Sequence, residues 1–234
     1  MIRIATEKDW GDISIISRES GYMDYINEVG QRYLNFGDTF VYDVDGIRGF
    51  IKAEYLIDGS VHLSGLRVSP RHRRQGIASA LTMHAVDHAK DRRCVSSRIL
   101  VDVTNRASQQ LSEGLGFRII GRYCFYGGLI DTTGFAPVLY SQKFFNIGWK
   151  FVRLDKIRDE VGVLGKGGAR LTEFLDNESS TNVRHFTILE RGEFRVVAGN
   201  GIITVPFDMK DLIPDNVSTF SGFEEAFLLE KSLV

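Results

Sequence analysis

Residues 68–81 read Val68-Ser-Pro-Arg-His-Arg-Arg-Gln-Gly-Ile-Ala-Ser-Ala-Leu81, and this stretch decides the fold. The preceding residues, 61–68, are rich in branched apolar side chains and predict a strand that Pro70 ends. Beyond the stretch, apolar residues and histidines recur at helical spacing as far as His88, so a helix is expected to begin near Gly76. A strand, a basic turn marked by glycine and a helix, in this order, are suited to hold a phosphate.

The start of a helix leaves backbone N–H groups unpaired and carries a partial positive charge. A pyrophosphate is therefore expected to accept hydrogen bonds from the amides of residues 74–79, where Gly76 and Ala78 keep side chains out of the way. Nucleotide-binding Rossmann and P-loop patterns fit less well, because the glycine spacing differs and no Gly-Lys-Ser/Thr follows.

The spacing Arg73-x-x-Gly76-x-Ala78 resembles the Arg/Gln-x-x-Gly-x-Gly/Ala signature of the GCN5-related N-acetyltransferases (GNAT). This resemblance implies that the turn binds the diphosphate of acetyl-CoA.

A second stretch, residues 105–117, is similar to the Asn-x-x-Ala-x-x-Leu-Tyr-x-x-x-Gly-Phe helix of the same family. It reads Asn105-Arg-Ala-Ser-Gln-Gln-Leu-Ser-Glu-Gly-Leu-Gly-Phe117. Ser108 stands where the family has alanine, which is a small change. Ser112 stands where it has tyrosine, which is a large one.

The order of the expected elements is also that of the family over residues 1–127. We expect strands at 2–6, 39–44, 49–57, 61–68 and 99–104 and after 117, and helices from Thr6 or Asp9 through Ile16, at 23–34, from Gly76, and at 105–117. Asp45-Gly46 predicts a hairpin turn, because glycine tolerates a positive φ. The fold class expected is α/β (α+β), the GNAT fold, with a mixed, mostly antiparallel central sheet flanked by helices.

Two domains are expected: a GNAT domain at 1–140 and a smaller α/β extension at 141–234. In the extension we expect helices at 153–161 and 169–177 and strands at 186–189, 194–197, 202–205 and 225–230, with a plain loop at 165–168. Its role is left open: it could cover the acceptor site, extend the sheet or mediate contacts in a homodimer.

The composition narrows the class of protein. With 234 residues and 43% apolar content the chain can bury a core, and a net charge of −1 does not favour a partner such as nucleic acid or an acidic membrane. Cys94 and Cys124 have no metal-ligand spacing, so no metal is expected. Residues 1–9 form no apolar signal core, and no segment approaches the roughly 20 apolar residues of a membrane span. A cytoplasmic protein is expected.

In the resembling family the amine attacks acetyl-CoA directly, and pantetheine lies between the splayed fourth and fifth strands. Gly65 inside its strand suits this picture, because such a glycine marks a bulge or a close approach of backbone. By resemblance, the Leu66 N–H polarises the acetyl oxygen. The residues expected to bind the cosubstrate are Leu66, Arg67, Val68, Arg73, Arg74, Gln75, Gly76, Ile77, Ala78, Ser79, Asn105, Ser108 and Ser112.

The general base and acid are less well defined by the sequence. Glu54 and His62 are the candidates for the base, acting directly or through water. The Ser112 hydroxyl is too short and too weakly acidic to replace the family's tyrosine, so Tyr126, with Tyr123, is the candidate for the acid.

The expected function is acetyl-CoA-dependent N-acetyl transfer to a primary amine of a small molecule. Residues 65–70 and the long C-terminal segment are similar to amino-acid acetyltransferases of the histidine-acetylating type, which favours an amino acid as acceptor. The alternatives are a protein N-terminal or lysine acetyltransferase and a non-catalytic acyl-CoA sensor. A DNA-binding regulator is suggested only by the basic residues 71–74, and the near-zero net charge argues against this class of protein.

Overall fold

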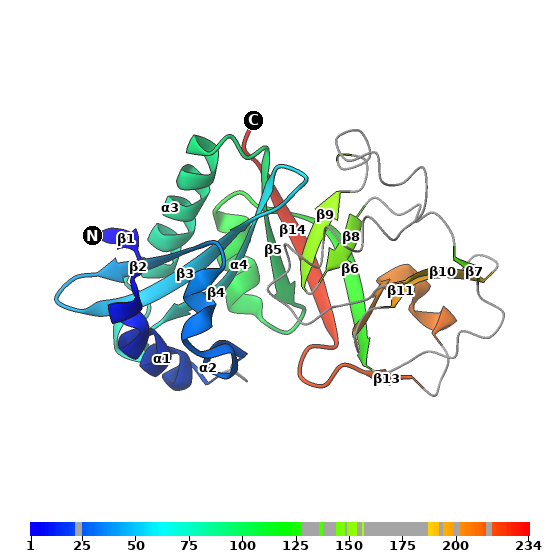
Figure 1. Cartoon of the computed structure of the whole chain (residues 1–234), viewed down its shortest axis with the longest axis horizontal. Coiled ribbons are helices and arrows are strands. Elements are labelled where there is room, and N and C mark those ends of the chain that lie inside the picture. Colours follow the sequence, from blue (N-terminus) through cyan, green and yellow to red (C-terminus); the bar gives the residue numbers. More distant parts are fainter. Residues whose placement is uncertain are drawn as a thin grey trace. The chain divides into compact units, whose positions relative to one another are not determined.

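The computed structural model describes residues 1–21, 25–127, 136–137, 144–147, 149–153, 156, 187–191, 194–198, 202–213 and 217–234. The chain forms two compact units. Unit 1 comprises Met1–Ile99, Gln110–Phe117 and Glu230–Val234, and unit 2 comprises Leu100–Gln109 and Arg118–Leu229 (Figure 1). The chain passes between the two units at residues 99–100, 109–110, 117–118 and 229–230, and not near residue 140. The division into domains at 1–140 and 141–234 stays a prediction.

Unit 1 is built on a mixed sheet. Its strand order is β1 (Ile2–Ile4), β2 (Asp38–Asp43), β3 (Ile47–Tyr55), β4 (Ser60–Val68), the first residues of β5 (Ser96–Asp102) and the last residues of β14 (Glu225–Ser232). Neighbouring strands from β1 to β4 run antiparallel, whereas β4 and β5 run parallel. The predicted strands are confirmed, with β5 beginning three residues earlier than expected.

Helices cover both faces of this sheet. Val41 of β2 packs with Ile13 and Ile16 of α1 (Trp10–Glu19) and Ile26 of α2 (Tyr25–Val29). The preceding residue, Phe40, contacts the rings of His84 and His88 of α3 (Ile77–Asp91), with ring centroids 4.9 and 5.0 Å apart. Because successive strand residues point to opposite faces, α3 lies on one face and α1 and α2 on the other (Figure 1).

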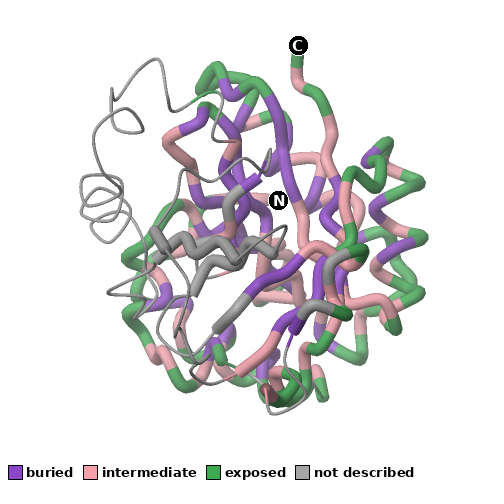
Figure 2. The backbone as a smooth tube through the Cα atoms, turned by 90° about the vertical axis from the view of Figure 1, so that its right-hand side faces the viewer, coloured by how far each residue is buried: buried purple, intermediate pink, exposed green. Residues whose placement is uncertain are grey.

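The remaining helical segments differ in part from the expectation. A helix was predicted at 23–34; α2 is shorter, and a 3₁₀ helix, Gly30–Asn35, continues it. Residues 22–24 lie outside the described residues. The strands of unit 1 are mostly buried or half-buried, while the outer turns of its helices are exposed (Figure 2).

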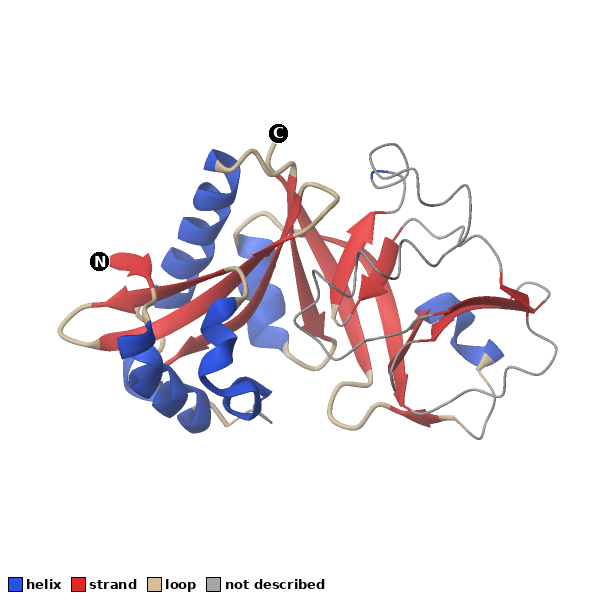
Figure 3. Cartoon of the chain, in the orientation of Figure 1, coloured by secondary structure: helices blue, strands red, loops and turns tan. Residues whose placement is uncertain are grey.

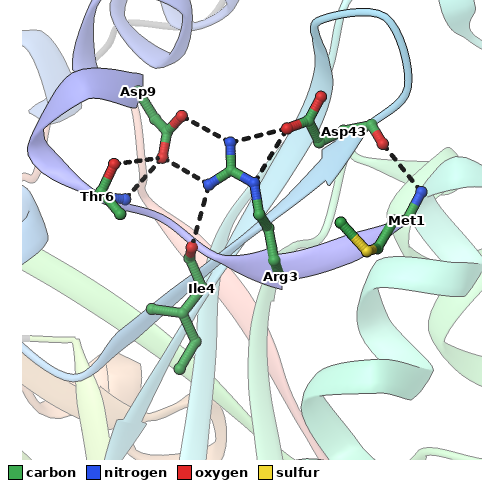
Figure 4. A network of polar contacts seen from close by, with 6 residues as sticks. All are labelled: Met1, Arg3, Ile4, Thr6, Asp9 and Asp43. Atoms are coloured by element: carbon green, nitrogen blue, oxygen red, sulfur yellow. Dashed lines mark hydrogen bonds and ion pairs between the residues drawn. The ribbon is translucent and has the colours of Figure 1, made fainter.

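A charged network ties the first strand to the start of α1. Both terminal nitrogens of Arg3 donate to the Asp9 carboxylate at 2.8 Å, and its Nε and Nη2 donate to Asp43 at 3.0 and 2.8 Å (Figure 4). Asp9 also accepts a hydrogen bond from the Thr6 N–H, which is one half of a capping box at the 3₁₀ turn Glu7–Asp9 that leads into α1. The Arg3 guanidinium holds the pKa of Asp9 well below its usual value.

A buried ion pair anchors the last residues of unit 1. Arg98 on β5 is 1% exposed and contacts Asp58 at 2.5 Å and Glu230 at 2.7 Å. It also donates to the Ser60 hydroxyl at 2.8 Å. Lys231 donates to the Leu115 carbonyl at 2.8 Å. The C-terminal five residues therefore belong structurally to unit 1.

Unit 2 contains a second run of strands (Figure 3). Their order is β14, β6 (Arg118–Gly127), β12 (Ile202–Pro206), β11 (Phe194–Ala198), β10 (Thr187–Arg191) and β7 (Ala136–Pro137), and β13 (Ser218–Thr219) also pairs with β6. A hairpin of β8 (Phe144–Ile147) and β9 (Lys150–Arg153) and a 3₁₀ helix, Phe207–Leu212, complete the described part. The four C-terminal strands predicted from the sequence are confirmed; β7, β8, β9 and β13 were not predicted.

The core of unit 2 is aromatic. Tyr123, Phe125, Phe144 and Phe151 are buried together, and Trp149 packs beside them. The helices predicted at 153–161 and 169–177 and the loop at 165–168 lie almost entirely outside the described residues. None of the helices described combines the length and the apolar character that crossing a bilayer requires.

Candidate active site

Strand β4 is interrupted by a bulge at Gly65. Lys52 of β3 pairs with Ser64, but Phe50 pairs with Arg67, so the single residue of β3 between these pairs lies opposite two residues of β4, Gly65 and Leu66. Gly65 has a φ of +61°, and a Cβ atom built on it would clash with the Tyr33 hydroxyl. Glycine is therefore required both by the backbone conformation and by the close approach of Tyr33, as the sequence predicted.

The pairing of β4 with β5 covers only the first part of β4. It runs from Ser60 opposite Ser96 to Leu63 opposite Ile99. The bulge begins directly after this point, and residues 64–68 are half-buried. The backbone groups of Leu66 and Val68 thus lie beyond the ladder with β5, and their role in binding pantetheine remains a prediction.

The turn between β4 and α3 presents an exposed helix start. A 3₁₀ turn, Pro70–His72, follows β4, and residues 73–76 are exposed. Gly76 adopts a left-handed conformation at φ +78°, and its carbonyl accepts the N–H of Ala80 at 2.9 Å. The amides of residues 77–79 thus precede the first intrahelical bond, and the space beside Gly76 is open. This geometry suits an anion.

Arg73 also has a structural role in this turn. Its guanidinium donates to the Val68 carbonyl at 3.4 Å and to the Ser20 carbonyl at 3.3 Å. It therefore links the end of β4 to the end of α1. Its part in binding the cosubstrate remains a prediction, as does that of the exposed Arg74 and Gln75.

The second motif forms α4 (Arg106–Gly114), which begins in unit 2 and ends in unit 1. The Asn105 side chain accepts a hydrogen bond from the Ser108 N–H at 3.1 Å, so Asn105 caps the helix. Ser112 is 4% exposed, and its carbonyl accepts the N–H of Phe117 at 3.0 Å. The structure thus gives Asn105 a capping role, and cosubstrate binding by these residues stays a prediction.

The two candidates for the base lie side by side. Glu54 on β3 and His62 on β4 are cross-strand partners, so both side chains lie on the same face of the sheet. Both are buried, at 9% and 4% exposure, which excludes a solvent-exposed role. Phe50, on the same side of β3, packs with α1 and α2. The pair therefore lies on the face opposite α3.

Three further polar residues on this face were not predicted from the sequence. The Lys52 ammonium lies 3.8 Å from the centre of the Tyr33 ring and donates to the Tyr33 carbonyl. Tyr25 stacks edge-on against Tyr33, with ring centres 6.3 Å apart. Burial raises the pKa of Tyr33 well above its usual value, so its hydroxyl stays protonated. The glycine at position 65 predicted a close approach to the strand. The sequence did not indicate that Tyr33 is the residue that approaches it.

The two tyrosines considered for the acid, Tyr123 and Tyr126, lie in unit 2. Tyr123 packs against Phe151 with ring centres 4.5 Å apart, which is an ordinary packing role. Burial raises the pKa of Tyr126, and its role as acid remains a prediction. Burial also raises the pKa of the Cys94 and Cys124 thiols, which argues against a thiolate nucleophile.

Comparisons with known proteins agree with this geometry. A sequence model of the acetyltransferase (GNAT) family matches residues 8–117. The crystal structure of a Thermoplasma acidophilum protein described as an acetyltransferase is similar to this chain, with a TM-score of 0.67 and 20% sequence identity over 99% of each chain. No curated protein sequence matches the chain.

Two further solved structures are similar over about half of the chain. The ribosomal-protein-S18-alanine N-acetyltransferase of Escherichia coli is 21% identical over 52% of this chain and 79% of its own, with a TM-score of 0.47. The PaiA N-acetyltransferase of T. acidophilum, solved with coenzyme A, is 19% identical over 51% of this chain and 89% of its own, with a TM-score of 0.46.

The family match and the mixed sheet flanked by helices agree with each other. The match begins just before α1 and ends at Phe117, so it includes the bulged strand and the turn before α3. Residues 8–117 are therefore an acetyltransferase domain of the GNAT family.

Proposed function

We propose that this protein is an acetyl-CoA-dependent N-acetyltransferase whose acceptor is a primary amine of a small molecule. The observation that carries the proposal is the bulged end of β4, which leads directly into an exposed helix start. The exposed start of α3 suits a diphosphate. The bulge at Gly65 suits an acyl group, because it lies beside the polar face that carries Glu54 and His62.

The chemistry follows from the residues at the bulge. A neutral amine attacks the thioester carbonyl, a C–N bond forms, the C–S bond breaks, and coenzyme A leaves as a thiolate. The Leu66 N–H stabilises the oxyanion, an interaction worth roughly 3 kcal/mol in comparable sites. The proton lost by the nitrogen goes to Glu54 or His62, directly or through water.

The test of the proposal is release of coenzyme A from acetyl-CoA across amino acids, polyamines, aminoglycosides and peptides. Release with a small amine supports the proposal, and release with peptides alone would move the function to protein acetylation. Tight binding of acetyl-CoA without release would favour a sensor, for which the buried Ser112 in place of tyrosine is the motivating observation.

Replacing Gly76 with valine is expected to raise the dissociation constant of acetyl-CoA about 10- to 100-fold, because the branched side chain would fill the open space that the diphosphate needs. Titration calorimetry measures the constant. The left-handed φ of +78° adds backbone strain of about 1–3 kcal/mol. Gly59→Val is the matched control, since Gly59 has a φ of +74° in the turn between β3 and β4. Equal binding by wild type and Gly76→Val would remove this site assignment.

Replacing Glu54 with glutamine is expected to lower kcat/KM about 10²- to 10⁴-fold. A general base works only when it is deprotonated, so the variant should also lose the acidic limb of the pH–rate profile. His62→Gln is the matched comparison, because His62 is the cross-strand partner of Glu54. Loss of the limb only in His62→Gln would transfer the role to His62, and an unchanged limb in both variants would exclude both.

A further inference from the structure

A cavity of about 370 Å³ lies in unit 1 beyond the C-terminal end of α3. The hairpin of β3 and β4 contributes Tyr55, Gly59 and Ser60 to its lining, and the loop after α3 contributes Arg92, Arg93 and Cys94. The 15 residues of α3 span about 22 Å, and this length separates the cavity from the helix start that suits a diphosphate. The volume is that of a pocket for a small ligand.

The hydrogen-bond donors of the hairpin are already used inside the hairpin or by the buried ion pair. The Leu56 N–H donates to the Ser60 carbonyl at 2.8 Å, and the Gly59 N–H donates to the Leu56 carbonyl at 3.0 Å. The Ser60 hydroxyl donates to Asp58 at 2.5 Å and accepts from Arg98 at 2.8 Å. A polar ligand in the cavity would therefore have to be recognised by the two arginines.

Arg92 is already balanced by a carboxylate. Its guanidinium lies 3.3 Å from the Asp38 carboxylate and 4.4 Å from the centre of the Tyr55 ring. The Tyr55 hydroxyl donates to the same carboxylate at 2.7 Å. Arg92 and Tyr55 thus form one wall of the cavity, which Asp38 holds in place.

Arg93 brings a second positive charge to the cavity. Within the part of the chain that the structure describes, its exposed side chain has no hydrogen bond, ion pair or aromatic contact. Its backbone is left-handed, with a φ of +62°, so the arginine occupies a position that glycine would adopt with less strain. The planar fork of its guanidinium has five N–H donors and matches a carboxylate in a bidentate manner.

The rest of the lining is neutral. Leu56 and the Tyr55 ring are apolar, and burial raises the pKa of the Cys94 thiol, so this thiol carries no charge. Because Asp38 balances Arg92, the cavity keeps one uncompensated positive charge, that of Arg93. A small ligand with one negative charge and an apolar body would complement this lining.

We propose that this cavity is a second binding site of unit 1, that it takes a small organic acid, and that Arg93 binds the carboxylate of this acid. The apolar part of the acid then lies against Leu56 and Cys94. The inference goes beyond the proposed function and does not depend on it, because neither acetyl-CoA nor an amine takes part.

The experiment uses benzoate as the probe and benzamide as its uncharged counterpart. Cys94 lines the cavity, whereas Cys124 lies in unit 2, and both thiols are buried, at 8% and 6% exposure. Their alkylation by iodoacetamide is followed separately by mass spectrometry of the peptides. Benzoate at about four times its dissociation constant is expected to slow alkylation of Cys94 about fivefold and to leave Cys124 unchanged, while benzamide protects neither thiol.

Two variants test the role of Arg93. Arg93→Met should abolish the protection of Cys94, because it removes the charge and the fork. Arg93→Gly should abolish the protection as well, while its melting temperature stays at or above that of the wild type, because glycine adopts a φ of +62° without strain.

Arg74→Met is the matched control. Arg74 is also exposed and also left-handed, with a φ of +63°, but it lies in the turn before α3. This variant should keep the full protection by benzoate.

The other results would overturn the proposal. No slowing of Cys94 by benzoate, or equal slowing of Cys94 and Cys124, overturns the site. Equal protection by benzamide, or unchanged protection in Arg93→Met, overturns the role of Arg93. Loss of protection in Arg74→Met would assign benzoate to the turn before α3, and equal protection by inorganic phosphate would overturn the choice of a carboxylate.

Discussion

Replacing Arg98 with methionine is expected to lower the free energy of unfolding by about 3–5 kcal/mol. Arg98 and Asp58 are almost completely buried, and their contact at 2.5 Å is the strongest reason for the carboxylate to be tolerated there. Removing the guanidinium would take the positive charge at 2.5 Å away from the buried Asp58 carboxylate, which would keep its hydrogen bonds from Ser60. It would also release Glu230, and with it the C-terminal residues of unit 1.

Chemical denaturation followed by far-UV circular dichroism measures this effect. Arg122→Met is the control: Arg122 also pairs with a glutamate, Glu225, but is 41% exposed, so the loss should stay below about 1 kcal/mol. A loss below about 1 kcal/mol in Arg98→Met as well would show that the buried network does not anchor unit 1.

Replacing Gly65 with alanine is expected to lower kcat/KM at least about 100-fold, which corresponds to a rise of roughly 2.7 kcal/mol in the activation free energy. The added Cβ would clash with the Tyr33 hydroxyl, and the φ of +61° would be strained for any residue other than glycine. Both effects would move the backbone at Leu66, whose N–H is expected to meet the oxyanion.

A double-mutant cycle with Tyr33→Phe separates the two effects. Removing the hydroxyl relieves the closest contact, so Gly65→Ala should cost less activity in the Tyr33→Phe background than alone. Gly46→Ala is the control for strain without a clash, because Gly46 has a φ of +108° and open space beside it. Additive effects in the cycle would contradict the account of the bulge.

The architecture of unit 1 could be predicted from the sequence because each local signal agreed with the fold. Three local signals each favour a backbone conformation that few other residues adopt. They are Pro70 after a branched apolar run, Gly76 before a helical repeat, and Asp45-Gly46 between two strands. The GNAT family was predicted from the same residues and is confirmed for 8–117.

Other features depend on contacts between distant parts of the chain, and the sequence could not predict them. Nothing near Arg98 indicates that Asp58, 40 residues earlier, and Glu230, 132 residues later, will meet it. The approach of Tyr33 to Gly65 is likewise set by packing of α2 and the following 3₁₀ helix rather than by a local motif. For this reason Glu54 and His62 could be named as candidates from the sequence, whereas Tyr25, Tyr33 and Lys52 beside them could not.

The central claim is that an amine takes the acetyl group directly from acetyl-CoA at the bulged end of β4. Its most direct test is a single reaction mixture in which free coenzyme A is measured by thiol detection and the N-acetylated acceptor by mass spectrometry. We expect that an amino acid yields both products in equal amounts, and that Gly65→Ala suppresses both together. Release of coenzyme A without an acetylated amine, or binding of acetyl-CoA with neither product for any acceptor, would contradict it.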